Sequence, residues 1–99
     1  MNIFDDNHAK LMIKAILTLE TEDEVKAFLE DIMTNKEIID ISQRLGVAKM
    51  LREKEVYSKI SKETGASSAT ISRVNRCCLY GSGGYKTVLD RLEASEEIK

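Results

Sequence analysis

Small hydroxyl side chains and arginines share one stretch of the sequence, between Ser67 and Arg76. If a helix begins there, the hydroxyl of Ser67 or Ser68 caps its first turn, and its leading backbone N–H groups can meet a phosphate. The expected outward face of this helix consists of Ser68, Ala69, Ser72, Arg73 and Arg76. Short side chains let a helix sit deep in the major groove, where hydroxyls bond to base edges and methyl groups contact thymine. The chemistry predicted for this stretch is recognition of double-stranded DNA.

Gly65 marks the centre of a turn in front of that helix. Ile60 and the small Ser61 lie five and four residues before the glycine, and Ile71 and Val74 lie six and nine residues after it. Two helices that cross steeply need small and apolar residues where they touch, and the turn needs a residue that tolerates a left-handed φ. This spacing predicts a helix-turn-helix.

The helix-turn-helix is expected from about Tyr57 to Arg76. On its first helix, Ser58, Lys59 and Lys62 are placed for contacts with backbone phosphates. A helix, a glycine and a second helix also occur in bundles that never touch DNA. The number of matching positions and the local positive charge favour DNA binding over such a packing unit.

The charge is unevenly distributed along the chain, although the net charge is only −2. Residues 1–43 contain ten acidic and four basic residues, whereas residues 44–86 contain nine basic and three acidic ones. Residues 87–99 contain four acidic and two basic ones. A basic centre between acidic ends is typical of a phosphate-binding surface, but it also fits a solvated helix face.

The cysteine, histidine and apolar content of the chain argues against several classes of function. Cys77 and Cys78 are adjacent, and the single histidine, His8, lies far away, so we expect no zinc or other metal site. We expect the two cysteines to be reduced in the cytoplasm and to pack as small hydrophobes. With no apolar run near the length of a membrane span, no membrane partner is expected. No arrangement of side chains suggests catalysis, so we expect no enzyme.

The apolar pattern predicts an all-α fold of about six helices in a single domain over residues 1–99. The first helix is expected to be capped by Asp6 or Asn7 and to run to about Leu19. The second is expected to start near Glu22, after a capping box formed by Thr21 and Glu24.

A third and longer helix is expected after a second capping box at Thr34, ending near Lys54. Its expected buried stripe consists of Ile38, Ile41, Leu45, Ala48 and Leu51. A short helix is predicted over 57–64, followed by a helix that turns Ile71, Val74 and Leu79 inward. The glycines of residues 81–84 must break the chain before a last helix over about 85–94, and the charged tail from Ser95 is expected to fray.

The residues from Gly65 to Arg73 resemble the helix-turn-helix core of the Trp repressor family. The run 69–77 and the segment Tyr80-Gly-Ser-Gly-Gly-Tyr85 resemble the YerC/YecD branch of that family, which is Trp-repressor-related. The resemblance covers roughly 20–92 and implies an intertwined homodimer in which helices of both chains share one core. It also implies two recognition helices that enter successive major grooves, about 34 Å apart.

The resemblance also places residues of the interface. Carried over position by position, the residues near the bases are Ser67, Ser68, Ala69, Thr70 and Ser72. Ser58 and Ser61 match basic residues that lie near phosphate in the Trp repressor. Their neighbours Lys59 and Lys62 are expected to replace those charges.

The Trp repressor holds its corepressor tryptophan between two arginines, and here the resemblance implies an effector pocket at Arg44 and Arg73. The match at Arg44 needs a one-residue gap, which leaves Gln43 as an alternative. The glycine that follows the recognition-helix arginine in the Trp repressor is Val74 here. Because a branched side chain would intrude on an indole, we expect no tryptophan and no other cofactor.

These observations predict a sequence-specific, DNA-binding transcriptional regulator of bacterial type, a repressor that acts as a homodimer. The alternative is a helical protein–protein interaction module without direct DNA readout, in which the acidic first third is the binding surface.

Overall fold

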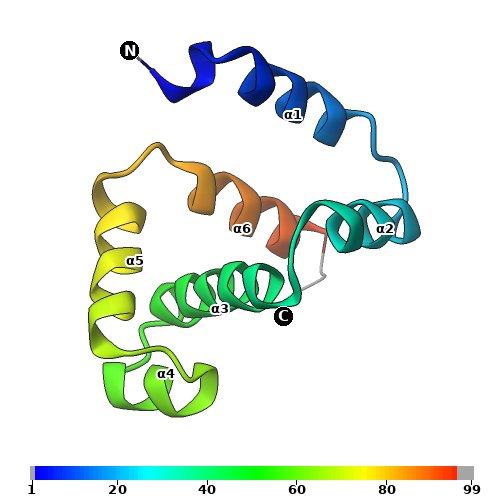
Figure 1. Cartoon of the computed structure of the whole chain (residues 1–99). Coiled ribbons are helices and arrows are strands. Elements are labelled where there is room, and N and C mark those ends of the chain that lie inside the picture. Colours follow the sequence, from blue (N-terminus) through cyan, green and yellow to red (C-terminus); the bar gives the residue numbers. More distant parts are fainter. Residues whose placement is uncertain (1, 96–99) are drawn as a thin grey trace. The chain divides into compact units, whose positions relative to one another are not determined.

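The structure is a computed structural model, and it describes residues 2–95. It is all-α, as predicted, and its elements are shown in Figure 1. In chain order they are η1 (Ile3–Asp5), α1 (Asn7–Leu17), α2 (Glu22–Ile32), α3 (Asn35–Arg52), α4 (Tyr57–Thr64), α5 (Ser68–Tyr80) and α6 (Gly84–Ala94). The chain divides into two compact units, residues 1–35 and 36–99, which are described separately. Most of the tail expected to fray, residues 96–99, lies outside the described residues.

The helices of the first unit begin at side-chain caps. Asp6 accepts a hydrogen bond of 3.0 Å from the backbone N–H of Ala9 and so caps α1. Thr21 accepts one of 3.1 Å from the N–H of Glu24 and caps α2. The Glu24 carboxylate accepts in return from the N–H of Glu20, at 2.8 Å, one residue before the usual capping-box donor. Both predicted starts are therefore confirmed.

Apolar side chains of the first unit remain uncovered. Neither α1 nor α2 contains a buried residue. Exposed large side chains of the two helices are Leu11, Met12, Ile13, Ile16, Leu17, Val25 and Ile32. Isolated short helices are marginal in water, since most helical stability comes from packing an apolar face. The first unit therefore needs a cover for these faces.

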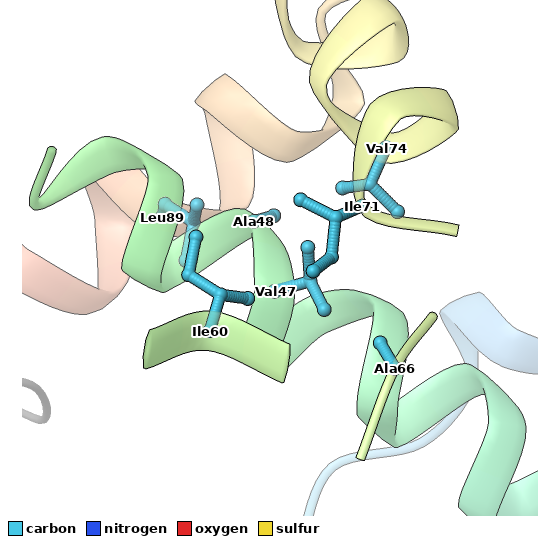
Figure 2. Close-up of a cluster of buried hydrophobic side chains, with 7 residues drawn as sticks. All are labelled: Val47, Ala48, Ile60, Ala66, Ile71, Val74 and Leu89. Atoms are coloured by element: carbon cyan, nitrogen blue, oxygen red, sulfur yellow. The ribbon is translucent and has the colours of Figure 1, made fainter. Parts of the chain in front are cut away.

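The second unit is built around one small core, shown in Figure 2. It contains all seven buried residues of the described chain, namely Val47, Ala48, Ile60, Ala66, Ile71, Val74 and Leu89. The core joins α3, α4, α5 and α6, with Ala66 from the turn between α4 and α5. The expected inward positions Ile60, Ile71 and Val74 are confirmed.

Two expectations about the buried positions were wrong. On α3 the buried residues are Val47 and Ala48, whereas Ile41 and Leu45 of the expected stripe are 47% and 37% exposed. On α5, Leu79 is 63% exposed instead of inward. Ile41 and Leu45 border one hollow of the second unit and Leu79 borders another, so these side chains line open space instead of filling the core.

α5 ends where a close approach of the backbone requires glycine. The N–H of Gly81 donates a hydrogen bond of 2.9 Å to the carbonyl oxygen of Cys77. A Cβ on Gly81 would lie 2.4 Å from that same oxygen, which no side chain tolerates. The predicted break in the chain is therefore confirmed, and α6 follows at Gly84.

Candidate nucleic-acid interface

The turn between α4 and α5 is held by short hydrogen bonds within the chain. Gly65 ends α4 with a left-handed φ of 77°, and its N–H donates to the carbonyl oxygen of Ser61 at 2.8 Å. The hydroxyl of Ser61 donates in turn to the carbonyl oxygen of Ala66 at 2.7 Å. The Thr64 hydroxyl accepts from the N–H of Ala66 at 3.1 Å and donates to the carbonyl oxygen of Ile60 at 2.7 Å. These bonds fix the direction in which α5 leaves the turn.

A third helix braces the turn through Gln43. Its side-chain amide donates a hydrogen bond of 3.0 Å to the carbonyl oxygen of Thr64. This bond spans 21 residues and links α3 to the last residue of α4. The sequence did not predict this role of Gln43 or the burial of Ala66. Nothing in the sequence around a single glutamine or alanine indicates which distant residue it contacts.

Ser67 caps α5, one of the two alternatives that the sequence left open. Its hydroxyl accepts a hydrogen bond of 3.2 Å from the N–H of Thr70 and lies 3.2 Å from the Thr70 hydroxyl. Thr70 is half-buried. The other residues predicted for base contact are exposed, namely Ser67, Ser68, Ala69 and Ser72. The serine-rich first turn of α5 thus presents short side chains to solvent, while Thr70 helps to form the cap.

The basic residues of this surface differ in how they are engaged. Lys59 on α4 pairs with Glu55, with 3.1 Å between its Nζ and the carboxylate oxygen. The hydrogen bond to Glu55 raises the pKa of Lys59 above its usual range. Among residues 2–95, Lys62, Arg73 and Arg76 are exposed and take part in no ion pair. An anion could bind these three cations without displacing a carboxylate of the described residues, whereas at Lys59 it would displace that of Glu55.

The two arginines expected at an effector pocket do line one hollow. Arg44 of α3 and Arg73 of α5 border a pocket of about 150 Å³ together with Val74 and Tyr85. Gln43, the alternative to Arg44, instead holds the turn through Thr64. Burial raises the pKa of the Tyr85 phenol, while the positive charges of Arg44 and Arg73 act in the opposite direction. The charges of the two guanidinium groups therefore influence the Tyr85 phenol.

A second and larger hollow lies beside the first. It measures about 610 Å³, is mostly apolar, and is bordered by Ile41, Leu45, Cys77 and Val88 among others. Cys77 and Cys78 are both exposed in the chain, so the expectation that they pack in the core was wrong. Cys77 borders this hollow, and Cys78 borders another of about 240 Å³ together with Ala48 of α3 and Leu89 of α6.

Among residues 2–95, no three side chains of the metal-binding types gather in one place. None of the described helices has both the length and the apolar character needed to cross a membrane.

The fold and the turn geometry define an all-helical protein with a helix-turn-helix, and comparison with known proteins specifies its family. Residues 7–93 match the family of the Trp repressor protein, so the chain belongs to the Trp repressor family. It is a Trp-repressor-related protein of the YerC type. It is 48% identical over 85 residues to the uncharacterized protein YerC of Bacillus subtilis, covering 86% of this chain and 82% of that one.

Two solved structures share the fold. A TrpR-like protein from Eubacterium eligens superposes with a TM-score of 0.89 at 47% identity, covering 94% of this chain and 96% of that one. A Staphylococcus aureus protein, described as a Trp repressor candidate, superposes with a TM-score of 0.86 at 40% identity, with the same coverage.

Proposed function

We propose that this chain is a sequence-specific DNA-binding transcriptional regulator that acts as a homodimer and represses by steric occlusion. The observation that carries the proposal is the exposed side of α5, which combines the short side chains of its first turn with the exposed Arg73 and Arg76. Membership of the Trp repressor family supports the same conclusion. The activity proposed is regulation in the cytoplasm rather than catalysis.

In this proposal α5 enters the major groove and α4 lies against the DNA backbone. Ser68, Ala69 and Ser72 meet base edges, because their side chains are short enough for the helix backbone to approach the bases. Lys62, Arg73 and Arg76 neutralise phosphates and release counterions, which supplies most of the affinity. Lys59 and Ser58 contribute at the edge of the contact.

The dimer is proposed because both units leave apolar surface uncovered. Helices α1 and α2 of the first unit have no buried residue, and the second unit has an apolar hollow of about 610 Å³. A second copy of the chain carries the same exposed apolar faces, so the faces of two copies can cover each other. Burial of these faces in a shared core stabilises at roughly 25 cal/mol per Å² of apolar surface. Two copies then present two α5 helices to one palindromic site.

A selection experiment tests the proposal. Purified protein is incubated with genomic DNA fragments at low salt, with and without tryptophan, and the bound fragments are sequenced. We expect enrichment of fragments that share two inverted half-sites, with the same result in both arms. Absence of any preferred fragment, together with capture of a stoichiometric protein partner through the acidic first unit, would instead support an interaction module.

The oligomeric state is measured separately by sedimentation equilibrium. We expect a dimer for the wild type and a monomer for Leu45→Glu, because that change places a charge in the apolar hollow. A monomeric wild type at micromolar concentration would contradict the shared core. The exposed control Glu30→Gln is expected to stay dimeric.

A further inference from the structure

Tyr85 borders several hollows of the second unit at once. It lies in the first turn of α6, is half-buried, and packs against the core. Its side chain borders all three hollows described for this unit, of about 610, 240 and 150 Å³. These hollows are bordered by residues of α3, α5 and α6. Tyr85 is therefore common to the borders of all three spaces.

The smallest hollow brings Tyr85 next to two arginines. Its border combines Arg44 of α3 and Arg73 of α5 with Thr70, Val74 and Cys77. The charges of both arginines act on the phenol. Tyr85 of α6 thus borders the same hollow as Arg44 of α3 and Arg73 of α5.

We propose that Tyr85 is an internal wedge that holds α5 in position against α3, so that the DNA-facing side of α5 is presented without a small-molecule ligand. This inference rests on the function proposed above, in which α5 reads DNA. Tyr85 acts as a positioning residue, since it borders the inner side of α5 while Ser68 and Ser72 are exposed. The ring takes the space that an aromatic effector would need.

The sizes of the hollows support this role. Pockets that enclose a small-molecule ligand usually measure about 300–1,000 Å³. The hollow between the two arginines measures about 150 Å³ with the tyrosine in place. The largest hollow is open and apolar, and the second copy of the chain is expected to cover it. Removal of the ring would enlarge the space beside the two arginines so that it accepts an aromatic molecule, as apolar cavities made by truncation do.

Chemical rescue tests the wedge. The variants Tyr85→Ala and Tyr85→Phe are compared with the wild type for thermal unfolding, for amide hydrogen exchange in α5 and for affinity to a selected DNA site. We expect Tyr85→Ala to lose at least about tenfold in DNA affinity and to exchange α5 amides faster. Millimolar 4-methylphenol, which replaces the missing side chain, should restore both properties in this variant and leave the wild type unchanged. Tyr85→Phe should stay within about threefold of the wild type, because the ring remains.

Leu92→Ala is the matched control, because Leu92 also packs against the core from α6 but borders none of the three hollows. It should lose stability without any response to 4-methylphenol. If Tyr85→Ala does not fold, Tyr85→Leu takes its place with the same probe. A folded variant without the ring that binds DNA as the wild type does, or that ignores 4-methylphenol, would overturn the wedge. If the wild type binds no DNA, the proposed function fails, and the hydrogen-exchange response to 4-methylphenol still decides the role of Tyr85.

Discussion

The hydroxyl of Ser61 donates a hydrogen bond of 2.7 Å to the carbonyl oxygen of Ala66, across the turn at Gly65. Ser61 lies on α4 and Ala66 lies beyond the turn, so one side chain ties the exit of the turn to the helix before it. This bond adds to the left-handed glycine in fixing how α5 leaves α4.

We expect Ser61→Ala to lower the free energy of unfolding by about 1 kcal/mol, because the Ala66 carbonyl loses its partner in a half-buried position. Urea denaturation followed by circular dichroism measures the change. Ser58→Ala, on the exposed side of the same helix, serves as the control and should stay within about 0.5 kcal/mol. An equal effect of the two changes would contradict the structural role of Ser61.

Two glycines of the second unit should respond in opposite directions to alanine. Gly65 has a φ of 77°, so Gly65→Ala forces a side chain into left-handed backbone and should destabilise by about 1–2 kcal/mol. Gly46 lies inside α3, where a Cβ would meet only the Thr64 methyl group at 3.9 Å. Gly46→Ala should therefore stabilise by about 0.5–1 kcal/mol. Thermal unfolding of both variants checks the pair, and the same sign for both would contradict the turn geometry.

Gly81→Ala should destabilise the end of α5. The added Cβ would lie 2.4 Å from the Cys77 carbonyl oxygen, so the backbone has to shift at a cost of about 1–3 kcal/mol. Gly84→Ala is the control, because nothing lies within 4 Å of a Cβ built there. If the two variants unfold at the same denaturant concentration, the close approach at Gly81 does not exist in solution.

The ion cluster between α3 and α6 should give stability that is lost in acid. Asp90 accepts from Lys86 at 2.7 Å and also from Arg52, which bonds to Glu93 at 2.9 Å as well. The Lys86 bond, followed by the Arg52 bond, holds the pKa of Asp90 below its ordinary value.

Because the folded-state pKa of Asp90 is depressed, its contribution is fully present above the unfolded value of about 3.9 and disappears as the pH falls through the folded value. We expect Asp90→Asn to be less stable than the wild type at neutral pH, by a small margin since the pair is exposed. The difference should vanish as the pH is lowered from about 5 to 2. A constant difference over this range would exclude Asp90 as its source.

Glu55 should limit the contribution of Lys59 to DNA binding. Since Lys59 pairs with Glu55 at 3.1 Å, phosphate and carboxylate compete for the same ammonium group. We expect Glu55→Gln to tighten DNA binding and to steepen its dependence on salt by up to about one counterion. Glu30→Gln on α2 changes the net charge equally without releasing Lys59, and fluorescence anisotropy at several salt concentrations compares the two. An equal gain in both variants would indicate a general charge effect.

Local features of the fold were predictable because each depends on residues close together in sequence. The caps at Asp6, Thr21 and Ser67 need only a polar side chain and the N–H groups just after it. The stop at Gly65 needs only a residue that tolerates positive φ. Helical periodicity around this glycine was sufficient to predict the buried positions on α4 and α5.

Contacts between distant residues were not predictable in the same way. Gln43 and Thr64 are 21 residues apart, and no pattern in either segment indicates that they meet. Leu79 carries an apolar side chain at helical spacing, but periodicity does not say where the neighbouring helix ends. The ion pair of Lys59 with Glu55 joins residues four apart, so the sequence spacing alone was sufficient to predict it.

The central claim is tested most directly by removing the two exposed arginines of α5 and measuring affinity for the selected DNA site. The double variant Arg73→Ala, Arg76→Ala is compared with Arg91→Ala, which removes an exposed arginine from α6. We expect the double variant to lose about tenfold or more in affinity and about two counterions from the salt slope, while Arg91→Ala stays near the wild type. Unchanged affinity and slope in a folded double variant would contradict DNA recognition by α5.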